Sequence, residues 1–462
     1  MAGGLNGRNV LNALEPLPEM TAVLYREPPF QYPEAVSAEG SWITDARGQR
    51  YLDMSGGAAV SCVGHGHPTV VQAIRQQLDT MAFAHTAFFT NTPQEALAER
   101  LRGRIGDDNA RVYFSSGGSE ANETALKLAW QYQRAVGEAS RQVVISREHS
   151  YHGNTFGTLS VSGNPGRRRA SAAPLLDWPR IPPCYPLREQ AGDESLAQYA
   201  QRSAEALEQA ILEAGPGNVA AFICEPVVGS SLGVVAPPQG YLARVRDICD
   251  RYGVLWIADE IMCGSGRTGT WFAFEQLGPQ PDIVTLAKGI GGGYVPLAAT
   301  VLNGRIAEVL EAGGFAHGHT YVGHATACAA GLAVQTVFDE ENLLERAAMN
   351  GRHLAALLND RFGQHPNVAE VRGMGMFHGL ELVADRETLA GFHDRPGIAT
   401  DIRRAAMTEG LVCYPGSITV SGATVPHIML APPLTATVDE LAEGVDRLAR
   451  ALARVLQSGN HS

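Results

Sequence analysis

Short apolar runs alternate with amphipathic stretches through the middle of this chain. The runs are rich in β-branched and aromatic residues and begin near positions 111, 142, 220, 253, 282 and 297. Apolar strands separated by helices are typical of a parallel or mixed sheet that is covered on both faces. The pattern therefore predicts an α/β fold whose central sheet spans about residues 110–303.

Two helices are marked by their first residues as well as by their periodicity. After a glycine turn at residues 117–119, apolar side chains recur on one stripe from Ala121 to Tyr132. The last helix opens at Thr437, and Glu440 three residues later completes a capping box ahead of leucine and valine at helical spacing. We expect this last helix to pack on a smaller domain.

The length of 462 residues allows two to three domains, or one large domain with a smaller satellite. A long helical stretch follows Gly331, and a glycine-rich turn precedes a β-rich segment around residues 377–383. We expect residues 61–335 to form a large domain and residues 336–462 a smaller α+β domain. Residues 1–60 are expected to form a segment that joins the small domain.

The charge of the chain narrows its possible partners. The formal net charge is −12, whereas binding of nucleic acid needs a basic face that neutralises phosphates. The one basic cluster, Arg167 to Arg169, lies among glycine and proline and is expected to be solvated loop surface. We therefore expect no nucleic-acid partner.

The cysteines and the first residues bear on the cellular location. The seven cysteines are scattered without a CxxC pair, a pattern that favours reduced thiols and no metal site. The first 20 residues lack a basic segment followed by an apolar one, and no stretch reaches the ~20 apolar residues of a membrane span. We expect a cytoplasmic protein that does not bind membranes.

Two charged residues end apolar runs in the predicted sheet. Lys288 ends DIVTLAK and precedes GIGGGY, so it either leaves the sheet for solvent or presents an amine where glycines let a ligand approach. Asp259 lies at the end of the run GVLWIAD. A carboxylate there either caps a helix or meets a positive partner, because a buried charge without a partner is costly.

Two further segments carry groups that suit a ligand. SSGGSEAN turns a strand into a helix N-terminus at Gly118 and Ser119, where free amides and the helix dipole favour a phosphate. Tyr151 and His152 directly follow another strand. They are either core or surface residues, or they offer a flat aromatic face on which a pyridine ring stacks.

Pyridoxal 5′-phosphate (PLP) has four groups that a protein can bind: a phosphate, an aromatic ring, a ring nitrogen and an aldehyde. These groups match the glycine turn, the stacking aromatic, the strand-end acid and the strand-end lysine. PLP acts as an electron sink while its ring nitrogen is protonated, and an adjacent carboxylate keeps the proton there. The combination therefore predicts a PLP site with Lys288 as the Schiff-base lysine and Asp259 beside the ring nitrogen.

With these motifs the chain resembles the class III aminotransferases of fold type I, from about Tyr51 to Leu434. The resemblance implies a PLP-dependent transferase fold, in which the large domain holds a mostly parallel seven-stranded sheet. The matching segments are GHGHPTVVQAI at 64, FSSGGSEANETALKLA at 114, SYHGNTFGTLSVSG at 150, CEPVVG at 224, PPQGYL at 237, ADEIMCGSGRTG at 258, LAKGIGGGYVPLAA at 286 and HGHTYVGHATACAAGLA at 317.

The resemblance also implies roles for single residues. Gly118 and Ser119 would hold the phosphate, Ile261 would pack on the ring face opposite Tyr151, and Thr320 would reach the phosphate from a partner subunit. A homodimer with shared active sites follows, and its further pairing into a tetramer stays open.

Two more residues take their expected places from the resemblance. Glu225 would lie near the cofactor and the substrate entrance. Arg267, in the GRTG segment, would support the Asp259 strand or be purely structural.

The chain departs from its relatives at the edges of the expected site. Met262 stands where several relatives carry a glutamine that bonds the phenolic oxygen of the cofactor, and methionine cannot donate that bond. Tyr414 lies in the segment where amine:pyruvate transaminases use an arginine for an α-carboxylate. How this chain recognises a carboxylate is therefore open.

Other departures concern the size of the substrate pocket. Ala58 and Ala59 lie where amine:pyruvate transaminases carry a large aromatic, so the pocket would accept a bulky or long amine. Phe88 and Phe89 match pocket-lining positions and would suit an apolar amine, although aromatics in such a run are also common core residues.

The expected function is transfer of an amino group from an amine or ω-amino acid to a keto acid or other carbonyl acceptor, by a ping-pong mechanism through Lys288. Relatives on the same scaffold are racemases, aminomutases and decarboxylases, so these reactions remain alternatives. A catalytically silent PLP-binding scaffold is a third possibility, which the intact Lys288 and Asp259 oppose.

Overall fold

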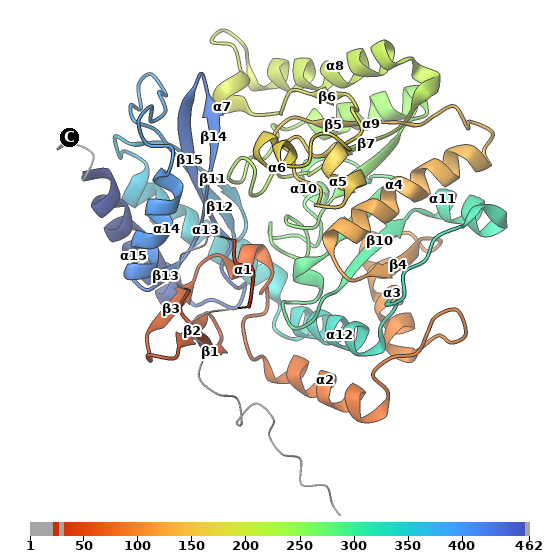
Figure 1. The fold of residues 1–462 in the computed structure, drawn as a ribbon, viewed down its shortest axis with the longest axis horizontal. Coiled ribbons are helices and arrows are strands. Elements are labelled where there is room, and N and C mark those ends of the chain that lie inside the picture. Colours follow the sequence, from red (N-terminus) through yellow and green to blue (C-terminus); the bar gives the residue numbers. More distant parts are fainter. Residues whose placement is uncertain (1–21, 27–31, 458–462) are drawn as a thin grey trace, which may run out of the picture.

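The computed structural model describes residues 22–26 and 32–457. Three sheets organise the chain, and Figure 1 shows the largest of them beside a smaller part formed by the C-terminal third. The strand orders are β4-β10-β9-β8-β7-β5-β6, β11-β12-β15-β14 and β1-β2-β3-β13.

The six apolar runs of the sequence each form a strand of the seven-stranded sheet. Neighbouring strands are parallel except at β10, which is antiparallel to both β4 and β9. The predicted α/β fold with a mostly parallel sheet is thus confirmed. The strands are β4 (Arg111–Ser115), β5 (Val143–Arg147), β6 (Arg180–Ile181), β7 (Val219–Cys224), β8 (Leu255–Asp259), β9 (Ile283–Leu286) and β10 (Ala298–Leu302).

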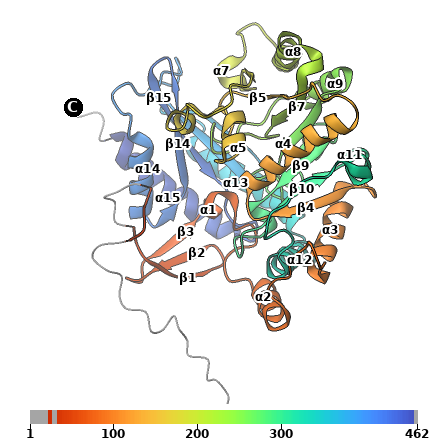
Figure 2. The same ribbon diagram turned by 45° about the vertical axis from the view of Figure 1, so that its right-hand side comes forward.

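Helices pack around this sheet, as the two views in Figures 1 and 2 show. They are α2 (Pro68–Thr80), α3 (Thr92–Ile105), α4 (Gly118–Ala135), α5 (Phe156–Val161), α6 (Pro165–Arg169), α7 (Pro186–Glu189), α8 (Leu196–Ala214), α9 (Tyr241–Tyr252), α10 (Phe274–Leu277), α11 (Gly304–Val309) and α12 (Ala325–Glu340).

The side chains of β7 show why both faces of the sheet are covered. Phe222 and Cys224 belong to a core shared with α8 and α9, whereas Ala221 and Ile223 belong to a second core shared with α4. Successive side chains of a strand point to opposite faces. A strand without polar residues therefore needs an apolar layer on each side.

The smaller part joins an antiparallel sheet to three helices. Its last helix begins with the predicted capping box, in which the Glu440 amide donates to Thr437 Oγ1 over 3.2 Å and the Thr437 amide donates to Glu440 Oε2 over 2.9 Å. The elements are β11 (Val368–Met374), β12 (Phe377–Leu382), β14 (Tyr414–Val420), β15 (Ala423–Leu430), α13 (Leu343–Phe362), α14 (Ile398–Thr408) and α15 (Val438–Gln457).

The N-terminal strands lie against the smaller part rather than against the large sheet. Leu411 of β13 pairs in parallel with Leu52 of β3. The domain boundaries at residues 60 and 335 stay a prediction. The strands are β1 (Ala35–Glu39), β2 (Trp42–Asp45), β3 (Arg50–Asp53) and β13 (Leu411–Val412).

A left-handed turn, α1 (Gly56–Ala59), follows β3. All four residues have positive φ: 54° at Gly56, 61° at Gly57, 70° at Ala58 and 63° at Ala59. Glycine adopts such angles without strain, whereas an L-residue with a Cβ loses about 1–2 kcal/mol. The two alanines are therefore strained here, directly before the functional site.

Within residues 22–26 and 32–457, no helix is long and apolar enough to cross a membrane. The expectation that the first 20 residues carry no leader concerns residues outside the described part of the chain.

Candidate active site

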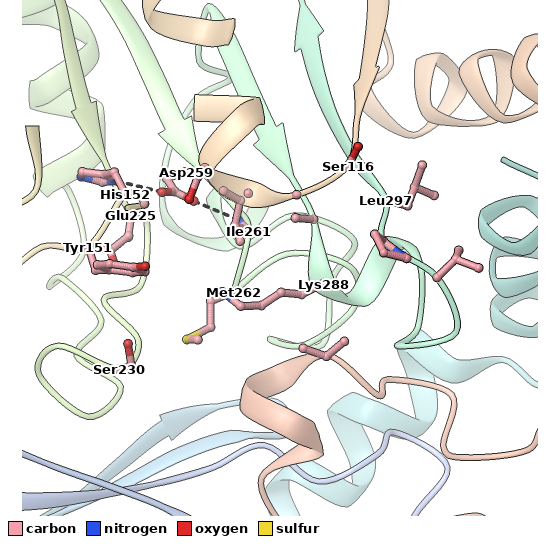
Figure 3. Close-up of a pocket in the computed structure, with 18 residues that line it drawn as sticks. Ser116, Tyr151, His152, Glu225, Ser230, Asp259, Ile261, Met262, Lys288 and Leu297 are labelled. Carbon is pink, nitrogen blue, oxygen red and sulfur yellow. Dashed lines mark hydrogen bonds and ion pairs between the residues drawn. The ribbon is translucent and has the colours of Figure 1, made fainter. Parts of the chain in front are cut away.

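The Lys288 side chain lines a pocket of about 350 Å³ at the carboxyl ends of β8 and β9 (Figure 3). Lys288 begins a one-turn helix after β9 and has a φ of 49°, a left-handed conformation that a lysine adopts only under constraint. Burial lowers the pKa of its amine below the usual value. The chain has one other lysine, the exposed Lys127, so Lys288 is the only amine of a lysine in this pocket.

The predicted site residues largely converge on this pocket. The lining includes the glycine turn, the Tyr151 segment, Glu225, Asp259 and the loop after β9. Its residues are Val60, Ser116, Gly117, Gly118, Ser119, Tyr151, His152, Gly153, Glu225, Ser230, Asp259, Ile261, Met262, Ala287, Lys288, Val295, Pro296 and Leu297.

Asp259, the last residue of β8, is held by three donors although it is only 3% exposed. Its Oδ2 accepts a hydrogen bond from Asn122 Nδ2 over 2.7 Å and lies 2.8 Å from His152 Nδ1, while its Oδ1 accepts from the Ile261 amide over 3.1 Å. Among the described side chains, no arginine or lysine lies within 4 Å of this carboxylate. It therefore suits a cationic group that enters the pocket.

Asn122 orients this carboxylate from the buried face of α4. Its Nδ2 also donates to the carbonyl of His152 over 2.7 Å, and its Oδ1 accepts from Thr285 Oγ1 over 2.7 Å. Sequence reasoning missed Asn122. The available signal was an asparagine inside the apolar stripe of a helix, since buried amides need partners.

The glycine turn before α4 presents a helix N-terminus to the pocket. Gly118 leaves room for Ile261, because a Cβ there would lie 2.9 Å from Ile261 Cδ1 and would displace that side chain. The Ser119 hydroxyl accepts a hydrogen bond from the Asn154 amide over 3.0 Å. The first turn of an 18-residue helix has free amides and a positive dipole end, so this corner suits a phosphate.

Tyr151 lines the pocket and carries a stacked cation on its ring. The guanidinium carbon of Arg167 lies 4.3 Å from the ring centroid, a typical cation–π contact. Arg168 donates to the carbonyls of Leu159, Ser160 and Ser162. Arg167 and Arg169 are exposed, as expected for this basic cluster, but the cluster forms the short helix α6 rather than a loop, and Arg168 is partly buried against these carbonyls.

Glu225 is a buried acid at the back of the pocket. Burial raises its pKa to about 7, and its Oε2 has no hydrogen-bond partner among the described residues. Arg147 donates to the Glu225 carbonyl and not to its carboxyl group. Glu225 is therefore an acid whose protonation changes near neutral pH within reach of a bound molecule.

Met262 and Ser230 close the pocket near the loop after β7. A Cβ at Gly229 would lie 2.2 Å from Met262 Sδ, so this glycine lets the loop approach the thioether. Met262 offers no donor here. Ser230 lines the same edge and was not anticipated from the sequence.

Five of the expected residues lie outside the pocket lining. Ala59 is buried in the core behind it, and Tyr414 at the start of β14 packs on the same core. Phe88 and Phe89 are 80% and 66% exposed, and Thr320 is exposed as well. Within a single chain these three exposed residues do not reach the site.

Arg267 is structural in this fold. Its guanidinium donates to the carbonyls of Met376 and Pro432, which joins the segment after β8 to the smaller part of the chain. The side chain is almost fully buried, and burial lowers its pKa to about 10. It does not line the pocket.

A mixed seven-stranded sheet with a buried lysine, a strand-end aspartate and a glycine turn before a helix at one edge defines a PLP-dependent enzyme of fold type I. The family model described as aminotransferase class-III matches residues 27–452, so the chain belongs to this family of aminotransferases.

Known proteins are similar to this chain over most of its length. An uncharacterized aminotransferase of Schizosaccharomyces pombe is 39% identical and is matched over 93% of this chain and 94% of its own length. The omega transaminase of Pseudomonas jessenii in complex with PMP has a TM-score of 0.86 and 33% identity, over 95% of this chain and 98% of that one.

A thermostable omega transaminase variant with a tryptophan-to-glycine substitution, engineered for asymmetric synthesis of enantiopure bulky amines, has a TM-score of 0.87. It is 32% identical over 96% of this chain and 98% of its own. Aminotransferase activity of this chain follows from family and neighbours alike.

Proposed function

We propose that this chain binds PLP at Lys288 and transfers an amino group from an amine or ω-amino acid to a keto acid or another carbonyl acceptor, in two separate half-reactions. The observation that carries the proposal is that Lys288 and Asp259 line one pocket with the phosphate turn. The family is PLP-dependent, and a structural neighbour binds PMP.

The residues of the pocket fit the cofactor. Asp259 is a buried carboxylate that lacks a lysine or arginine partner among the described residues, so a protonated ring nitrogen would supply the missing positive charge. Gly118 and Ser119 would hold the phosphate at the start of α4. Tyr151 and Ile261 would contact the ring, and His152 would keep Asp259 in place.

PLP, once bound, would supply an electron sink for the bond that breaks at the substrate carbon. Lys288 would then take the proton from that carbon with Nζ and deliver it to the cofactor. A lysine with an ordinary pKa is charged at neutral pH and cannot accept a proton. The lowered pKa of buried Lys288 favours this role.

We further propose a bulky or long amine as the donor. The small side chains of Ala58 and Ala59 precede Val60, which lines the pocket. The neighbour in which tryptophan is replaced by glycine was engineered for asymmetric synthesis of enantiopure bulky amines, and this supports the same relation between a small residue and a large substrate.

We propose a homodimer whose partner subunit completes the site. Phe88, Phe89 and Thr320 are exposed, and Tyr321 from the Thr320 segment lines a second hollow that shares Ser116 with the pocket. Large exposed aromatics beside a pocket favour a subunit interface. Phe88 and Phe89 would then contact the substrate of the partner, and Thr320 its phosphate.

We infer a cytoplasmic location from the cysteines. All seven are free thiols and all are buried in the described structure. Unpaired cysteines in this number are typical of a reducing compartment.

A single-turnover experiment tests the function. The PLP-loaded enzyme is mixed with a panel of amines and ω-amino acids, and the absorbance of the lysine-bound cofactor should disappear with formation of a carbonyl product. Addition of pyruvate or 2-oxoglutarate should restore it. Exchange of the substrate proton with solvent deuterium but no net transfer would instead indicate a racemase or a related reaction.

A further inference from the structure

The pocket contains almost no positive charge for a substrate anion. Among its lining residues, Lys288 is the only lysine or arginine, while Glu225 and Asp259 are both acids. Lys288 is committed to the cofactor in the proposed function. A keto acid carboxylate that enters this pocket therefore needs a cation from outside the lining.

Arg167 is an exposed cation beside this pocket, next to the lining residue Tyr151. Its guanidinium stacks on Tyr151, and its charge adds to burial in lowering the pKa of Lys288, so it lies within electrostatic reach of the site. No carboxylate or carbonyl of residues 22–26 and 32–457 accepts a hydrogen bond from this guanidinium. Stacking occupies its flat face and leaves its N–H edge free for a bidentate contact.

Local contacts fix the backbone that carries Arg167. The Arg167 amide donates to Asn164 Oδ1 over 3.1 Å, which caps the start of α6. The adjacent Arg168 donates to two carbonyls of α5 and to that of Ser162, over 2.7–3.2 Å. The anchoring of Arg168 ties α6 to α5 and orients Arg167 towards Tyr151.

The other arginines near the site are already bound to the protein. Arg147 donates to the Glu225 carbonyl, and Arg267 donates to the carbonyls of Met376 and Pro432. Both are almost fully buried. Arg147 Nε and Arg267 Nη2 lack a hydrogen-bond partner among the described residues, but neither arginine lines the pocket, and of the three guanidinium groups only that of Arg167 is exposed.

We propose that Arg167 binds the carboxylate of the keto acid acceptor and so determines which acceptors the enzyme uses. This inference rests on the proposed function and names the residue that replaces the arginine missing near Tyr414. The phosphate of the cofactor is a separate anion, held at the N-terminus of α4 by Gly118 and Ser119. Arg167 acts on the substrate alone.

The test compares Arg167→Met with Arg169→Met, a matched control in the same short helix that is exposed and lies one residue beyond the anchoring Arg168. The aminated, cofactor-loaded enzymes are mixed with pyruvate, 2-oxoglutarate or benzaldehyde, an acceptor without a carboxylate. KM for both keto acids should rise about 10–100-fold in Arg167→Met, while the rate with benzaldehyde should change less than about 3-fold. Arg169→Met should behave as wild type.

Binding of unreactive carboxylates gives a second readout that needs no turnover. Calorimetric titration of the PLP-loaded enzymes with glutarate and propionate should show a Kd that is about 10–100-fold higher in Arg167→Met. The Kd of Arg167→Lys should lie between those of the wild type and Arg167→Met. Lysine keeps the positive charge but lacks the two N–H groups that bind a carboxylate in a bidentate way. This result supports the inference even if the enzyme catalyses another PLP reaction.

Three results would overturn the proposal. An equal loss with keto acids and benzaldehyde would mean that Arg167 only positions Tyr151. A weaker affinity for PLP itself, measured by absorbance titration of the apoenzyme, together with unchanged carboxylate binding, would assign Arg167 to the phosphate. Unchanged KM and unchanged Kd in Arg167→Met would show that the carboxylate binds elsewhere.

Discussion

His152 Nδ1 lies 2.8 Å from Asp259 Oδ2, and this contact joins the segment after β5 to the end of β8 (Figure 3). The same oxygen accepts a hydrogen bond from Asn122, so Oδ2 has two partners within the protein. Oδ1 keeps one donor, the Ile261 amide. The two neighbours therefore fix the orientation of the carboxylate and leave Oδ1 with more free acceptor capacity than Oδ2.

Replacement of His152 by Phe should slow the amine half-reaction without abolishing it. A hydrogen bond to a charged group contributes about 1.5–3 kcal/mol, so the donor half-reaction should slow about 10–100-fold. Stopped-flow measurement of the amine half-reaction checks this. His365→Phe, a change in the loop after α13, serves as the control and should leave the rate unaltered. Equal rates in both variants would remove His152 from the positioning of Asp259.

The small number of lysines makes the cofactor attachment easy to test. Borohydride reduction of the PLP-loaded protein followed by peptide mass analysis should label the peptide of Lys288, because Lys127 lies exposed on α4. Lys288→Ala should lose the absorbance of lysine-bound cofactor, and turnover should fall by about 10²–10⁴-fold or more, since the proton carrier is lost. Lys127→Ala should retain both. Turnover that survives in Lys288→Ala would refute the assignment.

Glu225 makes stability depend on pH. Its pKa of about 7 in the fold lies above the ordinary value of 4.5 in the unfolded chain, so the folded state binds more protons between these values. The contribution of Glu225 to the free energy of unfolding is fully present below pH 4.5. It decreases as the pH rises towards and through 7, and the whole decrease is about 1–3 kcal/mol. Glu225→Gln should remove this loss.

Chemical denaturation of the wild type and Glu225→Gln at pH 5 and pH 8 measures the effect. The wild type should lose more unfolding free energy between the two pH values than the variant does. Glu213→Gln, an exposed change at the end of α8, controls for removal of one charge. The idea fails if the pH dependence of Glu225→Gln equals that of the wild type.

The left-handed turn before the pocket offers a stabilising substitution. Ala58 has a φ of 70° and is not fully buried, so Ala58→Gly should relieve strain and raise the unfolding free energy by about 1 kcal/mol. Ala206→Gly, in the middle of α8, should lower it by about 1 kcal/mol, because its backbone is helical. Thermal unfolding of the two variants gives the comparison. A loss of stability in Ala58→Gly would contradict the strain at this turn.

Local sequence was sufficient for most of the fold. Each apolar run became a strand because residues such as Phe222 and Ile223 leave neither face of β7 polar, and only a covered sheet buries both. The capping box at Thr437 marked the start of α15 for a similarly local reason, since its two hydrogen bonds join residues three apart.

The residues that support the site were harder to foresee. Asn122 and Arg167 each take their partners from distant segments, 137 residues away for Asp259 and 16 for Tyr151. Sequence patterns report neighbours along a helix or strand, and they do not show which side chains meet across a pocket. Arg167 is exposed, as the sequence predicts, but its contact with the ring of Tyr151 forms only in the fold.

What the sequence by itself determined is the chemistry that Lys288 and Asp259 offer, because a lysine and a carboxylate at the ends of buried strands need partners wherever the strands lie. Tertiary structure alone decided how these groups are oriented and that Arg167 lies on the ring of Tyr151. Orientation depends on contacts such as those of His152 and Arg167, and these form only when β5, α6 and β8 come together in space.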